Sequence, residues 1–204
     1  PYITYPQGNF ASPVFHGERP DPMPHYEMTG NPVSIAFSEQ SPPVKMRSFK
    51  LYQDTKEIRD VKILDKDNDP NRLLTERQFA LFPLQPLEYD TDYRAVFEYR
   101  QNGKDRTAEW TFSTQKPDYP YFIVKGGETL AIESGQKYFI HWQDFWCLKQ
   151  CERYNYRTNR DTQIDIIERQ AGGIIIRVNG SKGSSIRLMP EGEDRRAITL
   201  YLWK

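Results

Sequence analysis

The sequence lacks net charge, long apolar runs and any catalytic signature. Lysine plus arginine and aspartate plus glutamate both number 28 in 204 residues, so no overall field steers the chain toward DNA or an anionic membrane. The longest stretch without a charged side chain is 1–17, and prolines and polar residues interrupt it. We therefore expect no membrane-spanning segment and no nucleic-acid partner.

The chain also lacks an initiating methionine and a signal peptide. It opens at Pro1, so we expect a processed product or an excised fragment. Aromatic residues make up 14% and charged residues 27% of the chain, a composition that argues against intrinsic disorder. Composition therefore indicates a folded protein and assigns it no activity.

Short runs rich in Val, Ile, Phe, Tyr and Thr, separated by Gly, Pro, Asn and Asp, predict an all-β protein. In the first half the expected strands are 32–37, 48–53, 58–64, 77–82, 93–100 and 107–114. Asn102-Gly103 precedes the last of them and favours a type I′ hairpin turn. Ala108, Trp110 and Phe112 alternate with polar residues, which predicts a sheet with one wet face.

A proline-rich segment and a linker set the expected domain limits. Prolines recur through 1–30, and we interpret this segment as an extended strap along the first domain rather than a strand or helix. The linker is expected at 115–120, giving domains 1–116 and 117–204. The second should be a smaller β-sandwich or barrel with an irregular insert at 143–161. Its expected strands are 121–124, 129–133, 137–142, 163–168, 173–179, 185–189 and 197–203.

The stretch from Leu87 to Tyr93 resembles the tyrosine corner of immunoglobulin-like sandwiches, in which a tyrosine entering a strand bonds back to the backbone before the turn. The closing strand, with Trp110, Phe112 and Thr114 at alternate positions, resembles bacterial Ig-like domains. The first domain is therefore predicted to be an Ig-like β-sandwich preceded by the strap.

A more particular resemblance covers about residues 1–114. The segments that carry it are 5–8 (YPQG), 18–24 (ERPDPMP), 30–37 (GNPVSIAF), 71–73 (NRL) and 79–87 (FALFPLQPL). They resemble the region that follows the CAP domain (cysteine-rich secretory, antigen five, pathogenesis-related) in bacterial secreted proteins. The resemblance implies a periplasmic or secreted accessory region, with the CAP module in the same polypeptide but missing here. It supplies no catalytic residue.

Two groups of side chains are candidate metal ligands. Asp65, Asp67, Asp69 and Glu76 have the spacing of oxygens in a calcium-binding loop, but Pro70 stands where the sharp turn needs glycine, so the pattern favours a polar turn. The pairs His16/Glu18 and His25/Glu27 could each chelate a metal if they converge; solvated loops are the alternative.

The insert at 143–161 concentrates the aromatic residues most suited to recognition. An exposed cluster would bind a carbohydrate or protein, and the alternative is burial in a small β core. The candidate recognition cluster consists of Trp142, directly before the insert, and Phe145, Trp146, Tyr154 and Tyr156 within it. Arginines interleave with tyrosines at 153–160, but overall neutrality argues against nucleic acid.

The only two cysteines, Cys147 and Cys151, also lie in the insert. An extracytoplasmic setting, implied by the family resemblance, favours a disulfide between them over free thiols.

These features predict a non-catalytic, extracytoplasmic accessory region without a cofactor. The first domain would act as a rigid spacer, and the second would recognise a carbohydrate or protein. The alternatives are a metal-dependent hydrolase that uses the His-x-Glu pairs and a calcium-stabilised adhesion module.

Overall fold

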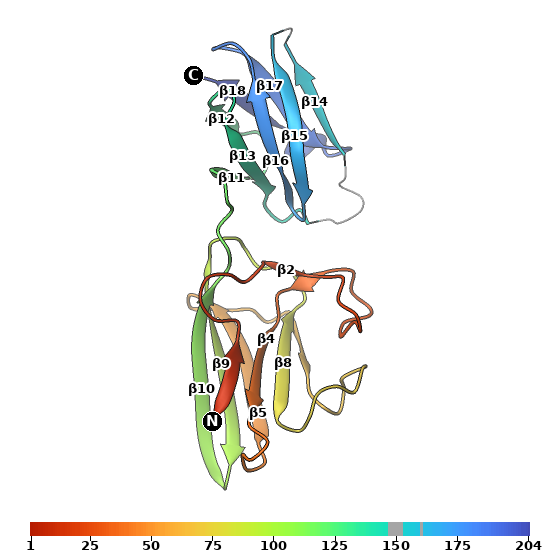
Figure 1. The fold of residues 1–204 in the computed structure, drawn as a ribbon, viewed down its shortest axis with the longest axis vertical. Helices are drawn as coiled ribbons and strands as arrows, with labels where there is room; N and C mark the ends of the chain where they lie inside the picture. The colour runs from red at the N-terminus through yellow and green to blue at the C-terminus, as the bar shows by residue number, and fades with distance from the viewer. Residues whose placement is uncertain (147–152, 160) are drawn as a thin grey trace. The chain divides into compact units, whose positions relative to one another are not determined.

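The computed structural model describes residues 1–146, 153–159 and 161–204 (Figure 1). The chain divides into two compact units, Pro1–Lys116 and Pro117–Lys204, at the position where the sequence analysis ends the first domain. Both units are built from strands, and within the described residues the one helix is a 3-10 turn, η1 (Asp194–Arg196). The all-β prediction is confirmed. No helix in the described part of the chain is long and apolar enough to cross a membrane.

The first unit is a sandwich of two four-stranded sheets, ordered β1-β4-β8-β7 and β10-β9-β5-β6. This is the strand order of an Ig-like sandwich, with β9 and β10 as its last two strands. The strands are β1 (Tyr2–Tyr5), β4 (Val33–Phe37), β5 (Lys45–Gln53), β6 (Lys56–Glu57), β7 (Val61–Leu64), β8 (Gln78–Pro83), β9 (Asp92–Gln101) and β10 (Lys104–Ser113). A separate ribbon joins β2 (Val14–Phe15) to β3 (Thr29–Gly30).

The N-terminal segment is more regular than a strap. Its first residues form β1, antiparallel to β4, because Tyr2–Tyr5 is a β-branched and aromatic run that fits a pleated sheet. The chain then crosses to the other sheet, where Ala11 bridges Thr114 in parallel and the Ser113 N–H donates to the Gly8 carbonyl at 2.8 Å. The prediction that 1–30 contains no strand was therefore wrong.

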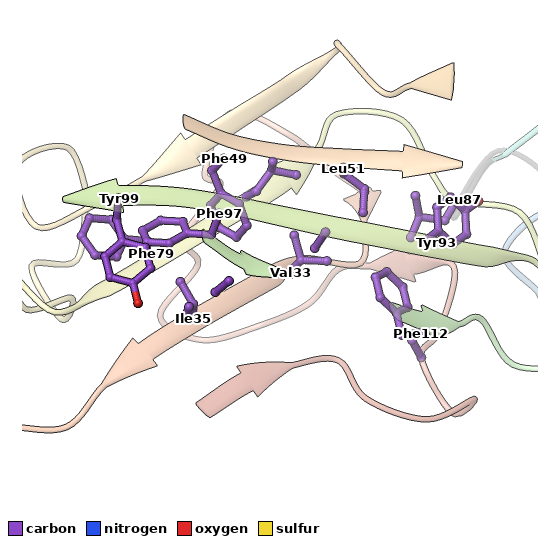
Figure 2. Close-up of a cluster of buried hydrophobic side chains, with 14 of the residues drawn as sticks. Val33, Ile35, Phe49, Leu51, Phe79, Leu87, Tyr93, Phe97, Tyr99 and Phe112 are labelled. Carbon is purple, nitrogen blue, oxygen red and sulfur yellow. The ribbon is translucent and has the colours of Figure 1, made fainter. Parts of the chain in front are cut away.

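The core of the first unit combines many aromatic rings with aliphatic side chains (Figure 2). Phe97 of β9 is fully buried, and its ring centroid lies 5.1 Å from that of Phe49 and 5.0 Å from that of Phe79. Burying one phenylalanine stabilises a fold by roughly 1.5–3 kcal/mol. The cluster therefore contributes much of the stability of this sandwich.

The β9–β10 hairpin follows its sequence signature. Asn102 and Gly103 have φ angles of 52° and 70°, and Gln101 pairs with Lys104 across them, which confirms the two-residue type I′ turn. Ala108 and Phe112 are buried, whereas Glu109 and Thr111 between them are exposed, so the sheet has the expected wet face.

The second unit is also a sandwich, which settles the sandwich-or-barrel alternative. Its sheets are ordered β11-β13-β16-β15 and β12-β18-β17-β14. The strands are β11 (Tyr121–Val124), β12 (Thr129–Ile132), β13 (Lys137–Trp142), β14 (Tyr154–Thr158), β15 (Gln163–Gln170), β16 (Gly173–Asn179), β17 (Ser185–Pro190) and β18 (Ile198–Leu202). The core contains Ile132, Ile140, Ile174, Ile176, Ile186, Leu188, Ile198 and Leu200, so it is mainly aliphatic.

One strand of the second unit lies where the sequence analysis predicts an irregular insert. Tyr154–Thr158 forms β14 and pairs with β17. Alternate tyrosines and a terminal threonine suit a strand, but the intervening asparagine and arginine made the segment resemble a loop.

Candidate binding groove

A tyrosine fixes one corner of the first unit. The Glu88 N–H donates to the Tyr93 hydroxyl oxygen at 2.9 Å, so the ring at the start of β9 holds the turn before it. Burial raises the pKa of Tyr93 to about 12, because the charged phenolate would lose its hydration. The predicted tyrosine corner is confirmed.

The second unit contains the same local bond, which the sequence analysis missed. The Glu133 N–H donates to the Tyr138 hydroxyl oxygen at 2.8 Å, again over five residues. Leu87-Glu88 before Tyr93 and Ile132-Glu133 before Tyr138 share one pattern: an apolar residue, a glutamate and a tyrosine five positions after it. This repeated pattern is the sequence signal from which the second tyrosine bond could have been predicted.

A groove of about 530 Å³ opens at one edge of the second sandwich, between edge strands β14 and β15. It is lined by Arg153, Tyr154, Asn155, Tyr156, Ile164, Asp165, Ile166, Arg169 and Glu191. The two sheets end here without a strand to close the space between them in the described part of the chain. The groove is therefore the open side of an otherwise packed core.

The strand registers place both tyrosines of β14 on the groove side. Tyr156 lies opposite Leu188 of β17, and Leu188 is fully buried, so both side chains point between the sheets. Tyr154 is buried farther in, whereas Tyr156 is 49% exposed. Tyr156 therefore stands at the mouth of the groove, where a ligand can reach it.

A β-bulge shapes the facing strand. Ile164 and Ile166 point between the sheets, and the register of β15 shifts between Ile166 and Glu168. The extra residue places Arg169 opposite the buried Ile174, on the same side as the two isoleucines. Burial raises the pKa of Tyr154 to about 12, and the nearby positive charge of Arg169 partly opposes that rise. Arg169 thus shares the inner side of the groove with Ile164, Ile166 and Tyr154.

The predicted aromatic surface is only partly present. Trp142 is fully buried, stacks on Tyr154 at 5.4 Å between ring centroids and donates from Nε1 to the Arg196 carbonyl at 2.8 Å. Trp142 is therefore a core residue, and Tyr154 reaches the groove only as part of its floor. The prediction of one exposed cluster was wrong for these two. For Trp142, its alternation with Lys137 and His141 was the available signal that it faces inward.

The other predicted aromatics lie apart from the groove lining. The Arg196 guanidinium lies 4.6 Å from the centroid of the Phe145 ring, and Phe145 packs against the core. The Trp146 ring lies 4.7 Å from that of His141 and covers Gly172, where an added Cβ would come within 2.9 Å of both side chains. Phe145 and Trp146 are half-buried, so Tyr156 is the most exposed member of the predicted set.

The acidic candidates form a polar turn. Asp69 is buried, and its carboxylate accepts hydrogen bonds from the N–H groups of Asn71, Leu73 and Leu74 at 2.7–3.0 Å. Burial raises the pKa of Asp69, but these hydrogen bonds outweigh it and hold the pKa below its usual value. Its oxygens therefore organise the loop backbone.

The remaining acidic candidates also have local partners or lie in solvent. Asp65 accepts from the N–H groups of Asp67 and Asn68, and Glu76 pairs with Arg77. Asp67 is exposed. Within the described ranges, no three His, Cys, Asp or Glu side chains come together as a metal site would require.

The structure does not assemble the remaining candidate residues into a site. His16, Glu18, His25 and Glu27 are all exposed in the N-terminal segment. The predicted Cys147–Cys151 disulfide lies outside the described residues and stays a prediction.

No family model and no curated protein matches the chain. Among solved structures, a titin fragment is 10% identical, with 98% of each chain covered and a TM-score of 0.27. The N-terminal eight Ig domains of Down Syndrome Cell Adhesion Molecule are 10% identical, with 99% of this chain and 27% of that chain covered and a TM-score of 0.30. Domains 4 and 5 of the S-layer protein SbsC are 11% identical, with 100% and 96% covered and a TM-score of 0.28. At these values the likeness carries no argument, and the Ig-like assignment rests on the sheet order and the tyrosine corner.

Proposed function

We propose that the chain is a non-catalytic, extracytoplasmic pair of β-sandwiches in which the first serves as a spacer and the second binds a ligand. The observation that carries the binding role is the groove between β14 and β15, with Tyr156 half-exposed at its mouth. Tyrosine is well suited to recognition because it offers a large apolar ring and a polar tip. The ligand is a carbohydrate or a protein.

The spacer role is supported by how the first unit is built. The aromatic core is continuous, and the tyrosine corner fixes the turn into β9. A sandwich of this kind keeps its shape without a ligand, which is what a spacer requires. The resemblance of residues 1–114 to the region after a CAP domain supports placing a CAP module upstream in the same polypeptide.

The cellular context is tested by detecting the natural protein with an antibody against this chain. The proposal expects a species larger than this chain in the periplasmic or secreted fraction. A cytoplasmic species of the same mass as this chain would overturn the extracytoplasmic assignment and the CAP association together.

The binding role is tested by screening the full chain against arrays of glycans and cell-surface proteins. Tyr156→Ala should abolish the strongest signal while leaving the thermal unfolding unchanged. Tyr26→Ala is the matched control, because Tyr26 is 39% exposed on the first unit. Equal loss of signal in both variants, or in neither, would contradict binding at the groove.

A further inference from the structure

Strand β14 lies at the edge of its sheet. Among the described residues it pairs only with β17, and Asn155, Tyr156, Arg157 and Thr158 are all exposed. An edge strand presents unpaired backbone N–H and C=O groups, and such an edge can accept a further strand from another chain. The backbone of β14 is therefore a template for an extended segment.

The outer face of this edge carries two arginines side by side. Arg157 lies directly opposite Arg187 of β17, and both are exposed. Like charges opposite each other on neighbouring strands are destabilising. Neither arginine forms a salt bridge with a described carboxylate, and Arg187 donates only a weak bond to the Met189 sulfur at 3.9 Å.

The strands themselves place no acidic side chain on this face, and Glu191 follows directly after β17. Core residues Ile186 and Leu188 point inward, so the residues between and beside them point out. The strand residues that the register places on the outer face are Thr129, Ala131, Asn155, Arg157, Ser185, Arg187, Met189, Thr199 and Tyr201, and none is acidic. The pair of positive charges therefore favours an anionic neighbour.

The inner side of the same edge carries apolar side chains beside Arg169. Tyr156 and Ile166 border the groove from the two facing strands, with Ile164 and Tyr154 deeper. Successive side chains of an added strand point to opposite faces, so one set would meet the arginines and the other would enter the groove. The two faces of β14 thus specify two alternating kinds of residue.

We propose that β14 binds an extended protein segment as an added strand, and that this segment alternates acidic and apolar residues. Its acidic side chains would lie beside Arg157, with Arg187 one strand further away on the same face, and its apolar side chains would fill the groove beside Tyr156. This inference rests on the proposed binding function and names the class of its ligand.

The test measures the affinity of the full chain for three fluorescein-labelled peptides by anisotropy. The first alternates glutamate and valine over eight residues, the second has the same composition in two blocks, and the third replaces every glutamate by lysine. The alternating acidic peptide should bind at least about tenfold more tightly than the other two. No preference for it would overturn the proposal.

Variants locate the binding. Arg157→Glu should weaken the alternating acidic peptide at least about tenfold, because the charge next to its carboxylates is reversed. Arg106→Glu, an exposed arginine on β10 of the first unit, should leave the affinity within about twofold and controls for net charge. Equal affinities of these two variants would contradict binding at β14.

The outcomes separate this inference from the proposed function. If a glycan binds in a Tyr156-dependent way and no peptide does, the binding role stands and the added strand is wrong. If neither binds, both are wrong. Sedimentation of the free chain as a dimer that Arg157→Glu strengthens would also overturn the proposal, because a second copy would then occupy the edge.

Discussion

The two units are both β-sandwiches, but their cores are built from different side chains. The first packs phenylalanines and tyrosines between its sheets, and the second packs mainly isoleucines and leucines. The first also uses the segment after β1 to cover the edge of β10, where Ala11 bridges Thr114. The second leaves a groove between β14 and β15. The comparison shows that one sandwich architecture can have an edge covered by the preceding segment in one unit and an open groove at an edge in the other.

The largest expected effect separates the two cores. Phe97→Ala should destabilise the first unit by about 3–5 kcal/mol, because it leaves a large cavity among packed rings. Ile176→Ala is the counterpart in the second unit and should cost about 2–5 kcal/mol there. Urea unfolding followed by the NMR signals of each unit checks both. A shift of both transitions by either substitution would contradict separate cores.

A smaller effect tests the shared tyrosine bond. Tyr93→Phe and Tyr138→Phe each remove a hydroxyl that accepts from a backbone N–H five residues earlier. Each should lower the stability of its own unit by about 1.5 kcal/mol. Differential scanning calorimetry measures the two losses. If only Tyr93→Phe has an effect, the bond in the second unit is incidental.

The smallest expected effect on stability concerns one carboxylate in each unit that accepts hydrogen bonds from backbone N–H groups of its loop. Asp69 accepts from three backbone N–H groups, and Glu128 accepts from those of Lys125 and Gly126 at 2.7 and 2.6 Å. In both cases burial raises the pKa, and the hydrogen bonds lower it by more, so the folded pKa lies below the unfolded one. Their stabilisation is therefore present above the unfolded pKa and lost as the pH falls through the folded pKa.

Neutral substitutions test this linkage. Asp69→Asn and Glu128→Gln should each cost about 1 kcal/mol at neutral pH and reduce the loss of stability between about pH 5 and pH 2. Melting temperatures across that range provide the measurement. EDTA should leave the wild-type value unchanged, whereas a drop that Asp69→Asn removes would restore the calcium hypothesis for this loop.

Local signals in the sequence predicted most of the fold. Asn102-Gly103 fixed the hairpin turn, and the Leu87–Tyr93 stretch indicated the corner, because both depend on residues close in the chain. The edge strand β14 was missed, since its pairing with β17 is a long-range contact that its polar composition conceals.

The site was predicted less well than the fold. The sequence singled out Tyr156 correctly as a candidate for exposure but grouped it with Trp142, which is buried. In Lys137–Trp142 the apolar set Tyr138, Ile140 and Trp142 alternates with a set that contains Lys137 and His141. This alternation was the signal that Trp142 faces the core. The groove itself depends on the bulge after Ile166 and on two edge strands from different sheets, neither of which a linear pattern contains.

The most direct test of the account is amide hydrogen exchange of the full chain with and without the alternating acidic peptide. We predict that added protection is confined to Tyr154–Thr158 of β14 and the facing residues of β15, while the first unit is unchanged. Protection on the first unit, or none on β14 at saturating peptide, would contradict the assignment of recognition to the open edge of the second sandwich.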